Sequence, residues 1–287
     1  MSLKCIAVAS AKSFGDFVIA HSVLRRVEET ARRRARLLAC AHLKPLNAVL
    51  SAEVGVTLVD SGEDRVPALF DVKKCGALAA ARSALTLRRR IQMVERNHNE
   101  VLAFDVLGIR ERFIAGHWPV IGPRARSSNI YDTYAQLLLD NGIRVAAPAI
   151  PGRLTRSVGV FPESRLDEKR LTPATVTLIL ERASRAGLAA RVFVLEGDES
   201  LPRDFPELVA ISRNFRSLAD AIRSVDSVVS ADSLPAHLAE YLARPVFVAS
   251  RTPNEYWLPL GCYSNASWAP FGEEDRLSAS LDRFLRT

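Results

Sequence analysis

Ile6–Val18, IAVASAKSFGDFV, is the stretch that decides the fold of this chain of 287 residues. Its first four residues are small and apolar, which suits a buried strand. From Phe17 onward apolar residues recur at helical spacing, which predicts a helix over Phe17–Arg36. The polar loop Ser10–Asp16 lies between them. A strand, a short loop and a helix in this order begin a βαβ unit, so we expect a parallel sheet.

The same alternation continues through both halves of the chain. In the first half, strands are expected at residues 6–9, 36–41, 56–59 and 101–104, with helical stretches between them. In the second half, strands at 157–161, 191–195, 227–230 and 246–249 alternate with helices at 173–186, 218–222 and 234–242. Ala146–Arg153, with its prolines and glycine, is typical of an interdomain linker. We therefore predict an α/β fold of two Rossmann-like domains, residues 1–150 and 151–287, facing a central cleft.

The composition narrows the class of protein. Hydrophobic residues make up 48% and charged residues 25%, as in soluble proteins with full cores. The formal charge of +7, with arginine runs at 32–36 and 88–90, suits a phosphate-bearing partner, although solvated helix faces explain it equally well. Four scattered cysteines argue against a zinc site or a disulfide framework. We see no signal peptide and no apolar stretch of the ~20 residues that span a bilayer, so we expect a cytoplasmic protein.

The first candidate for chemistry is Asp16, which follows Gly15 where the first strand passes into its helix. Open α/β domains bind ligands at the carboxyl edge of the sheet, where a carboxylate can take a proton from a hydroxyl as a general base. Gly15 would allow a tight turn or a close approach of the backbone. The alternative is that Asp16 is an ordinary helix N-cap, and the spacing alone favours the cap.

The second candidate is the polar loop Phe161–Pro173, which follows the first strand of the second half. It carries Ser164, Arg165, Lys169 and Arg170 and leads into a helix. Helix N-termini with nearby Lys or Arg bind phosphate well. A solvated charged loop explains the composition equally well.

The third candidate is Val228–Ala239, VVSADSLPAHLA. A strand ends at Asp232, and the helix that follows has Pro235 in its first turn, where proline is tolerated. His237 lies about one turn into that helix, on a side from which it could face the same crevice as Asp232. Taken alone, such a histidine is more often a structural hydrogen-bonding residue than a ligand.

Taken in order, these segments resemble glycosyltransferase family 9, the heptosyltransferases of bacterial lipopolysaccharide assembly. Lys12–Val18 is similar to the family's opening Ser-x-Gly-Asp turn and helix. Val160–Ser164 followed by Lys169–Pro173 is similar to its strand, small-residue turn and Lys-Arg-Trp-Pro segment. The most specific match is Ser230–Ala239, which is similar to the family's Asp-Ser/Thr-Gly-x-x-His-x-Ala block.

The resemblance implies a GT-B architecture and an inverting, metal-independent transfer. The N-terminal domain would bind the acceptor, a saccharide or lipid-linked glycan such as lipopolysaccharide, beside the inner membrane. The C-terminal domain would bind a nucleotide diphosphate sugar such as ADP-heptose. Asp16 would be the catalytic base, with Lys12, Ser13 and Gly15 at the acceptor.

For the donor, the resemblance implies that Lys169 contacts the pyrophosphate and that Ser233 and the neighbouring amides cradle a phosphate. The other expected donor contacts are Ser164, Asp232, Leu234, His237 and Arg251. We expect no cofactor and no metal ion, because helix N-termini and a lysine can stabilise a diphosphate leaving group. The sequence also contains no Asp-x-Asp motif.

Three positions depart from the family pattern and keep other functions open. Leu234 stands in place of a glycine, Glu163 in place of a small residue, and Ser250–Thr252 in place of a Gly-Pro-Thr turn. We expect Arg251 to supply phosphate contacts that the missing glycine would have given. One alternative is a GT-B-fold protein that binds without turnover, and another is a nucleotide-sugar epimerase. Binding of nucleic acid ranks last, because no aromatic-basic motif supports it.

Overall fold

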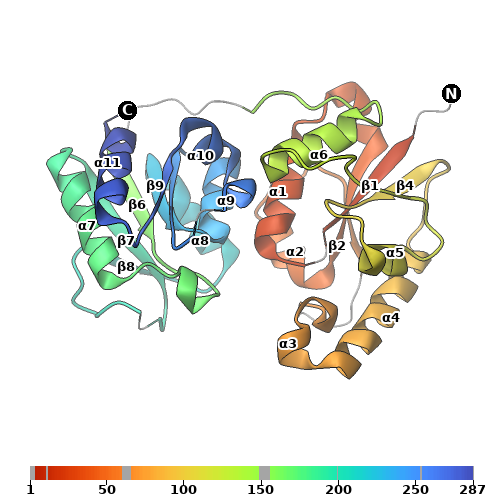
Figure 1. Ribbon diagram of the computed structural model, residues 1–287, viewed down its shortest axis with the longest axis horizontal. Coiled ribbons are helices and arrows are strands. Elements are labelled where there is room, and N and C mark those ends of the chain that lie inside the picture. The colour runs from red at the N-terminus through yellow and green to blue at the C-terminus, as the bar shows by residue number, and fades with distance from the viewer. Residues whose placement is uncertain are drawn as a thin grey trace. The chain divides into compact units, whose positions relative to one another are not determined.

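The computed structural model describes residues 4–10, 12–59, 66–148, 156–198, 200–252 and 254–286. The chain divides into two compact units, Met1–Pro148 and Ala149–Thr287, called unit 1 and unit 2 below. Each unit has its own parallel sheet and its own helices (Figure 1). Most of the predicted linker, from residue 149 on, lies outside the described residues.

Unit 1 is built on five strands. They are β1 (Cys5–Ser10), β2 (Ala35–Cys40), β3 (Val56–Val59), β4 (Glu100–Ala103) and β5 (Val120–Ile121). The strands lie in the order β3-β2-β1-β4-β5, and each neighbouring pair is parallel. The helices are α1 (Phe14–Arg25), α2 (Lys44–Asn47), α3 (Val72–Cys75), α4 (Ala77–Met93), α5 (Ile109–Ala115) and α6 (Ile130–Leu139), with 3-10 turns η1 (Glu29–Arg34), η2 (Ala41–Leu43) and η3 (Ala68–Phe70).

Unit 2 is built on six strands. They are β6 (Ser157–Phe161), β7 (Ala189–Leu195), β8 (Leu208–Ile211), β9 (Ser227–Ala231), β10 (Val246–Ser250) and β11 (Trp268–Pro270). Their order is β11-β10-β9-β6-β7-β8, again with each neighbouring pair parallel. The helices are α7 (Pro173–Arg185), α8 (Phe215–Arg223), α9 (Leu234–Tyr241), α10 (Leu260–Asn265) and α11 (Glu274–Leu285), with 3-10 turns η4 (Asp167–Lys169) and η5 (Glu255–Trp257).

In both units the chain adds strands first on one side of the first strand and then on the other side. In unit 1 the chain runs from β1 outward to β3 and then returns to β4 on the other side of β1. In unit 2 it runs from β6 outward to β8 and returns to β9 on the other side of β6. Such a switch point opens a crevice at the carboxyl ends of the two strands, where α/β proteins bind ligands. The switch points are therefore β1/β4 in unit 1 and β6/β9 in unit 2.

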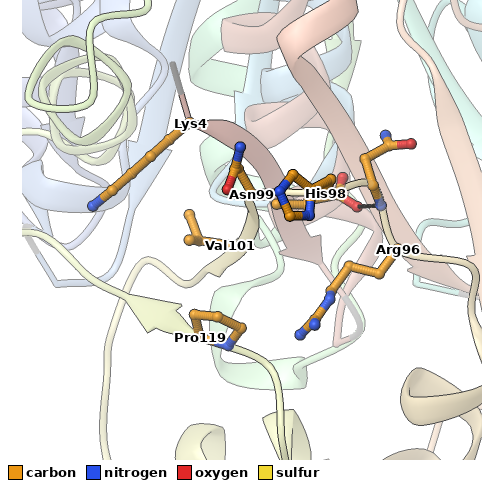
Figure 2. A pocket seen from close by; sticks show the side chains of 8 residues that line it. Lys4, Arg96, His98, Asn99, Val101 and Pro119 are labelled. Carbon is orange, nitrogen blue, oxygen red and sulfur yellow. Dashed lines mark hydrogen bonds between the residues drawn. The ribbon is translucent and has the colours of Figure 1, made fainter. Parts of the chain in front are cut away.

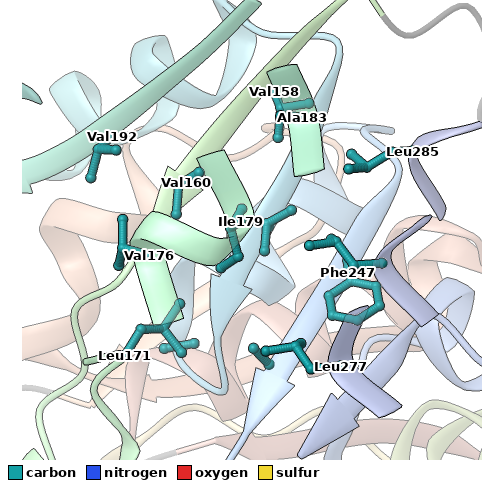
Figure 3. Close-up of a cluster of buried hydrophobic side chains, with 14 of the residues drawn as sticks. Val158, Val160, Leu171, Val176, Ile179, Ala183, Val192, Phe247, Leu277 and Leu285 are labelled. Carbon is teal, nitrogen blue, oxygen red and sulfur yellow. The ribbon is translucent and has the colours of Figure 1, made fainter. Parts of the chain in front are cut away.

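The apolar runs that predicted the strands are buried on both faces, as parallel sheets require. In unit 2, Val158 and Val160 of β6 pack with Ile179 of α7, Phe247 of β10 and Leu277 of α11 (Figure 3). In unit 1 a corresponding cluster joins the sheet to α4 and α5. The predicted α/β class and the four predicted strands of each unit are confirmed to within one or two residues at their ends.

The helix predicted over Phe17–Arg36 is wrong at both ends. It begins at Phe14 and ends at Arg25. The apolar residue that extended the prediction, Val27, is buried by an antiparallel bridge to Val145 and not by a helix face. The short strands β5, β8 and β11 and the helix α11 were not predicted individually.

Two members of the arginine run at 32–36 hold unit 1 together. Arg34 donates to the backbone oxygens of Lys4 at 3.0 Å and Gly142 at 2.9 Å. Arg36 donates to both carboxylate oxygens of the buried Glu100, at 2.7 Å each. These contacts join the end of η1 to the residue before β1 and to the segment after α6, and they join β2 to β4, so this part of the positive charge is structural.

None of the described helices combines the length and the apolar character needed to cross a membrane.

Candidate functional site

The switch point of unit 1 carries the loop that leads from β1 into α1. Ser13 is the N-cap of α1, in an extended conformation, and its Oγ accepts a hydrogen bond from the Asp16 amide at 3.2 Å. Gly15 and Asp16 therefore belong to the first turn of the helix, as its second and third residues. The prediction that Asp16 is the cap is wrong, because Ser13 binds that free amide; Gly15 does not form a separate turn.

Asp16 lies where an acceptor base is expected, at the carboxyl edge beside β1. It is half-buried, as are Ser13 and Gly15, while Lys12 is exposed. All four predicted residues of the acceptor loop thus lie together, next to the crevice of the β1/β4 switch point.

A second carboxylate, Asp105, lies at the same edge and was missed by sequence reasoning. β4 pairs with β1 in a register that sets Ala103 opposite Val8, so two residues further on Asp105 is level with Ser10. Burial raises the pKa of Asp105, and the negative charges of Asp16 and, more weakly, Glu111 raise it further. The signal was available in the sequence, since an acidic residue directly follows the apolar strand, but only the register brings it to Asp16.

His42 is another neighbour of this loop that the sequence did not reveal. It follows β2 at the carboxyl edge and is buried. Its ring meets the ring of Phe14 edge-on, with centroids 5.8 Å apart. Burial lowers the pKa of His42, and a backbone hydrogen bond at Lys12 partly offsets that effect. His42 therefore stays uncharged near pH 7, and its ring packs against Phe14 at the start of α1.

The switch point of unit 2 brings the second and third candidate segments together. Lys169, at the end of η4 in the β6 loop, and Asp232, directly after β9, form an ion pair with Nζ and Oδ2 2.6 Å apart. The lysine side chain is 37% exposed and the aspartate 12%. The ammonium group therefore remains open to solvent on one side of the pair.

His237 lies in the first turns of α9 and is buried close to this pair. Burial lowers the pKa of His237 to about 4, with Asp232 acting in the opposite direction and Lys169 in the same one. His237 is therefore neutral near pH 7, and the positive charge at this switch point belongs to Lys169.

Ser233 joins the two loops through its side chain. Its Oγ donates to the backbone oxygen of Glu163 at 3.0 Å, so the β6 loop and the start of α9 are tied to each other. Although Ser233 is the N-cap residue of α9, its side chain makes no cap hydrogen bond to the helix. The free amides at a helix N-terminus attract anions. Leu234, half-buried, is the first residue of this helix.

Glu163, which stands where the family pattern has a small residue, turns toward β7. Its Oε1 accepts a hydrogen bond from the Leu195 amide at 2.7 Å, at the carboxyl end of β7 and so on the side of β6 away from β9. Burial raises the pKa of Glu163, while the Leu195 amide lowers it. The carboxylate thus caps a strand, and the Lys169–Asp232 pair lies on the other side of β6.

For two predicted donor residues, Ser164 and Arg251, the structure shows no contact with the Lys169–Asp232 pair among the described residues. Ser164 supports its own loop: its Oγ accepts from the Leu166 amide at 3.3 Å, and its backbone oxygen accepts from Arg170 at 3.0 Å. Arg251 is exposed directly after β10, at the same edge of the sheet but one strand beyond β9. The structure brings Lys169, Asp232, Ser233 and His237 together, while Ser164 supports the loop next to Glu163 and Arg251 lies one strand away.

A pocket of about 630 Å³ lies at the opposite, amino edge of the unit 1 sheet. Figure 2 shows Lys4, Arg96, His98 and Pro119 around it. Glu100, which also lines it, is paired with Arg36. Because the pocket lies at the amino ends of β1 and β4, it is separate from the switch point. Within the described ranges, no group of three or more His, Cys, Asp or Glu side chains could hold a metal ion.

Solved glycosyltransferases share this architecture over nearly the whole chain. A family 9 glycosyl transferase from Veillonella parvula aligns over 99% of this chain and 98% of its own, with a TM-score of 0.63 and 13% identity. The chain has the GT-B fold of these enzymes. The ADP-heptose lipopolysaccharide heptosyltransferase II of E. coli aligns over 98% of both chains, with a TM-score of 0.59 and 14% identity. An E. coli heptosyltransferase solved with ADP aligns over 98% of both chains, with a TM-score of 0.56 and 13% identity.

The sequence matches no protein-family model and no curated protein. The likeness is therefore one of fold, and function has to be argued from the two switch points themselves.

Proposed function

We propose that the chain is a glycosyltransferase that moves a sugar from a nucleotide diphosphate donor to a saccharide or lipid-linked glycan acceptor. The observation that carries the proposal is the Lys169–Asp232 pair, 2.6 Å long, beside the N-terminus of α9 at the switch point of unit 2. Asp16 at the switch point of unit 1 supplies the second requirement, a base for the acceptor. Both lie where α/β folds bind ligands.

On the donor side, Lys169 binds the diphosphate. When a diphosphate binds, its oxygens compete with Asp232 for the ammonium group of Lys169. That group already lies at the carboxyl edge of the sheet, where it pairs with Asp232. The amides of Ser233 and Leu234 add a second group of donors at the start of α9, whereas Pro235 has no N–H and the Ala236 amide donates to the Ser233 backbone oxygen at 3.1 Å. Since one of the solved structures of similar fold contains ADP, ADP-heptose is the first donor to test.

On the acceptor side, the Asp16 carboxylate removes the proton from the acceptor hydroxyl. The hydroxyl oxygen then forms a bond to the anomeric carbon of the donor, and the bond from that carbon to the diphosphate breaks. The electron pair leaves with the diphosphate, and attack from the opposite face inverts the anomeric configuration. Lys12, Ser13 and Gly15 border the acceptor.

We propose that the reaction needs no divalent metal. The charge that develops on the leaving diphosphate is stabilised by Lys169 and by the partial positive charge at the start of α9. Arg251, exposed at the same edge, is a third source of positive charge. The protein would work in the cytoplasm, where nucleotide sugars are available.

One observation favours a binding protein without turnover as the second candidate. Leu234 fills the position where a glycine would let the backbone approach a phosphate, and its side chain is half-buried at the start of α9. Such a protein would bind a nucleotide diphosphate sugar but would not transfer the sugar.

The experiment is a transfer assay with ADP-heptose and with the UDP, GDP and CDP sugars, in EDTA, with a heptose-free lipopolysaccharide core as acceptor. Mass spectrometry of the acceptor would show the added sugar, and NMR of the new linkage would show inversion. Tight binding of a donor without any product or free nucleotide diphosphate would favour the binding protein. Transfer that requires added magnesium would contradict the metal-independent proposal.

A further inference from the structure

Exposed apolar side chains are concentrated in one segment of unit 1. Nine large hydrophobic residues of the described chain are exposed, and seven of them lie between residues 72 and 113. They are Val72, Leu78, Leu85, Met93, Val106, Ile109 and Phe113. Ile109 is 90% exposed and Met93 84%. Scattered single exposures are normal, whereas a concentration on adjacent elements marks an interaction surface.

The helix α4 carries a stripe in which apolar and basic residues alternate. Its members are exposed and are Leu78, Arg82, Leu85, Arg89 and Met93. At about 100° per residue, these five positions fall within an arc of roughly 80°. The buried residues of α4, on the opposite side, are Ala80, Ala84, Leu87 and Ile91. The stripe therefore faces away from the core along the whole helix.

The charge of this segment is strongly positive. α4 contains four arginines and no acidic residue in its 17 residues. Arg82 and Arg89 have no ion-pair partner in the described part of the chain. Lys73 of α3 and Arg112 of α5 are also exposed.

The three helices are neighbours in unit 1. α4 contacts both α3 and α5, and Figure 1 shows them side by side at one end of unit 1. Arg88 of α4 lies over the ring of Phe113 of α5, 5.0 Å from its centroid. We call the exposed side chains of α3, α4 and α5 the α3–α5 surface.

We propose that the α3–α5 surface binds the surface of a membrane that contains anionic phospholipids. Interleaved Leu, Met and Ile side chains can enter the boundary between headgroups and acyl chains, while the arginines and lysines bind phosphate and carboxylate headgroups. A second copy of the chain does not suit the surface, because a two-fold contact would set arginines against arginines. The inference does not depend on sugar transfer.

The test is co-sedimentation of the full chain with vesicles, without any sugar donor. Vesicles of phosphatidylcholine with an equal amount of phosphatidylglycerol are expected to bind the protein, and pure phosphatidylcholine vesicles to bind it weakly. The double variant Arg82→Gln/Arg89→Gln should bind the anionic vesicles about 25-fold more weakly, since each basic residue near such a surface is worth about fivefold. Leu85→Asn should weaken binding to both kinds of vesicle.

Two matched variants serve as controls for these changes. Leu139→Asn replaces a leucine that is 50% exposed, against 47% for Leu85, but lies on α6. Arg216→Gln removes an exposed arginine from α8 of unit 2. Both controls should bind as the unchanged protein does, and circular dichroism should show all variants folded. Equal binding by the α4 variants, equal binding to both kinds of vesicle, absence of binding, or dimers that α4 substitutions break would each overturn the proposal.

Discussion

The two switch points have the same strand order but different electrostatics. In unit 2 a lysine and an aspartate neutralise each other at 2.6 Å, next to a buried neutral histidine. In unit 1 two carboxylates lie close enough that Asp16 raises the pKa of Asp105. The difference teaches that one strand order supports two tasks. In the proposed mechanism, the crevice of unit 2 exchanges an internal carboxylate for an anionic ligand, and the crevice of unit 1 takes up a proton.

The largest effect that tests this difference between the two units is expected from a substitution of Asp16. Asp16→Asn should lower the rate of transfer by 10²–10⁴-fold, because a general base contributes about that much. Donor affinity, measured by calorimetry, should stay unchanged, because the proposed donor site lies in unit 2. A loss of donor affinity equal to the loss of rate would contradict the division of tasks.

Asp132→Asn is the matched control for this variant. Asp132 is the third residue of α6, as Asp16 is of α1, and follows an N-cap residue in the same position. It should cost the same small loss of helix stability without the loss of transfer.

Both units are expected to lose stability in acid, which sharpens the comparison. Burial lowers the pKa of His21 in unit 1 and of His237 in unit 2 to about 4, and it also lowers the pKa of His42 in unit 1. The unfolded chain takes up these protons near pH 6.5, so the stability is complete above that pH and is lost as the pH falls toward 4. His21 and His237 each account for about 3 kcal/mol of this loss, at about 1.4 kcal/mol per pH unit.

Guanidinium unfolding at pH 7 and pH 5 checks this expectation. Trp118 reports on unit 1, and Trp257 and Trp268 report on unit 2. His237→Leu should make the stability of unit 2 less sensitive to pH while unit 1 remains as sensitive as before. An unchanged pH dependence of unit 2 in this variant would show that His237 is not the group that titrates.

The smallest effect is expected from Asp105, which tests whether the two carboxylates of unit 1 act together. Asp105→Asn removes a negative charge beside Asp16, so the acid limb of the kcat/KM profile should move to lower pH. Asp226→Asn, a change at the amino ends of β6 and β9, should leave the profile in place. A lower rate with an unmoved profile would mean that Asp105 only supports the loop.

The sequence singled out both Asp232, directly after a strand, and Lys169, in the loop that follows another strand, and the structure brings these two side chains together. That they form an ion pair depends on the pairing of β6 with β9, which no local pattern reveals. Asp105 and His42 were missed for the same reason, since each becomes a neighbour of the acceptor loop only through the sheet.

The missed elements of the fold have local causes. β8 and β11 are four and three residues long, and β11 ends in a proline, so neither gives a clear periodic pattern. The predicted helix ran past Arg25 because Val27 continues the apolar spacing. Val27 instead pairs with Val145, which lies near the end of unit 1 in the sequence.

The most direct test of the account is a calorimetric titration of ADP, UDP, GDP and CDP into the protein in EDTA, with Lys169→Ala and Asp16→Asn in parallel. We predict that one nucleoside diphosphate binds without metal. Lys169→Ala should weaken it about tenfold or more, as expected for the loss of one charged hydrogen bond, while Asp16→Asn binds it normally. Failure of all four to bind, or binding that survives Lys169→Ala unchanged, would contradict a donor site at the β6/β9 switch point.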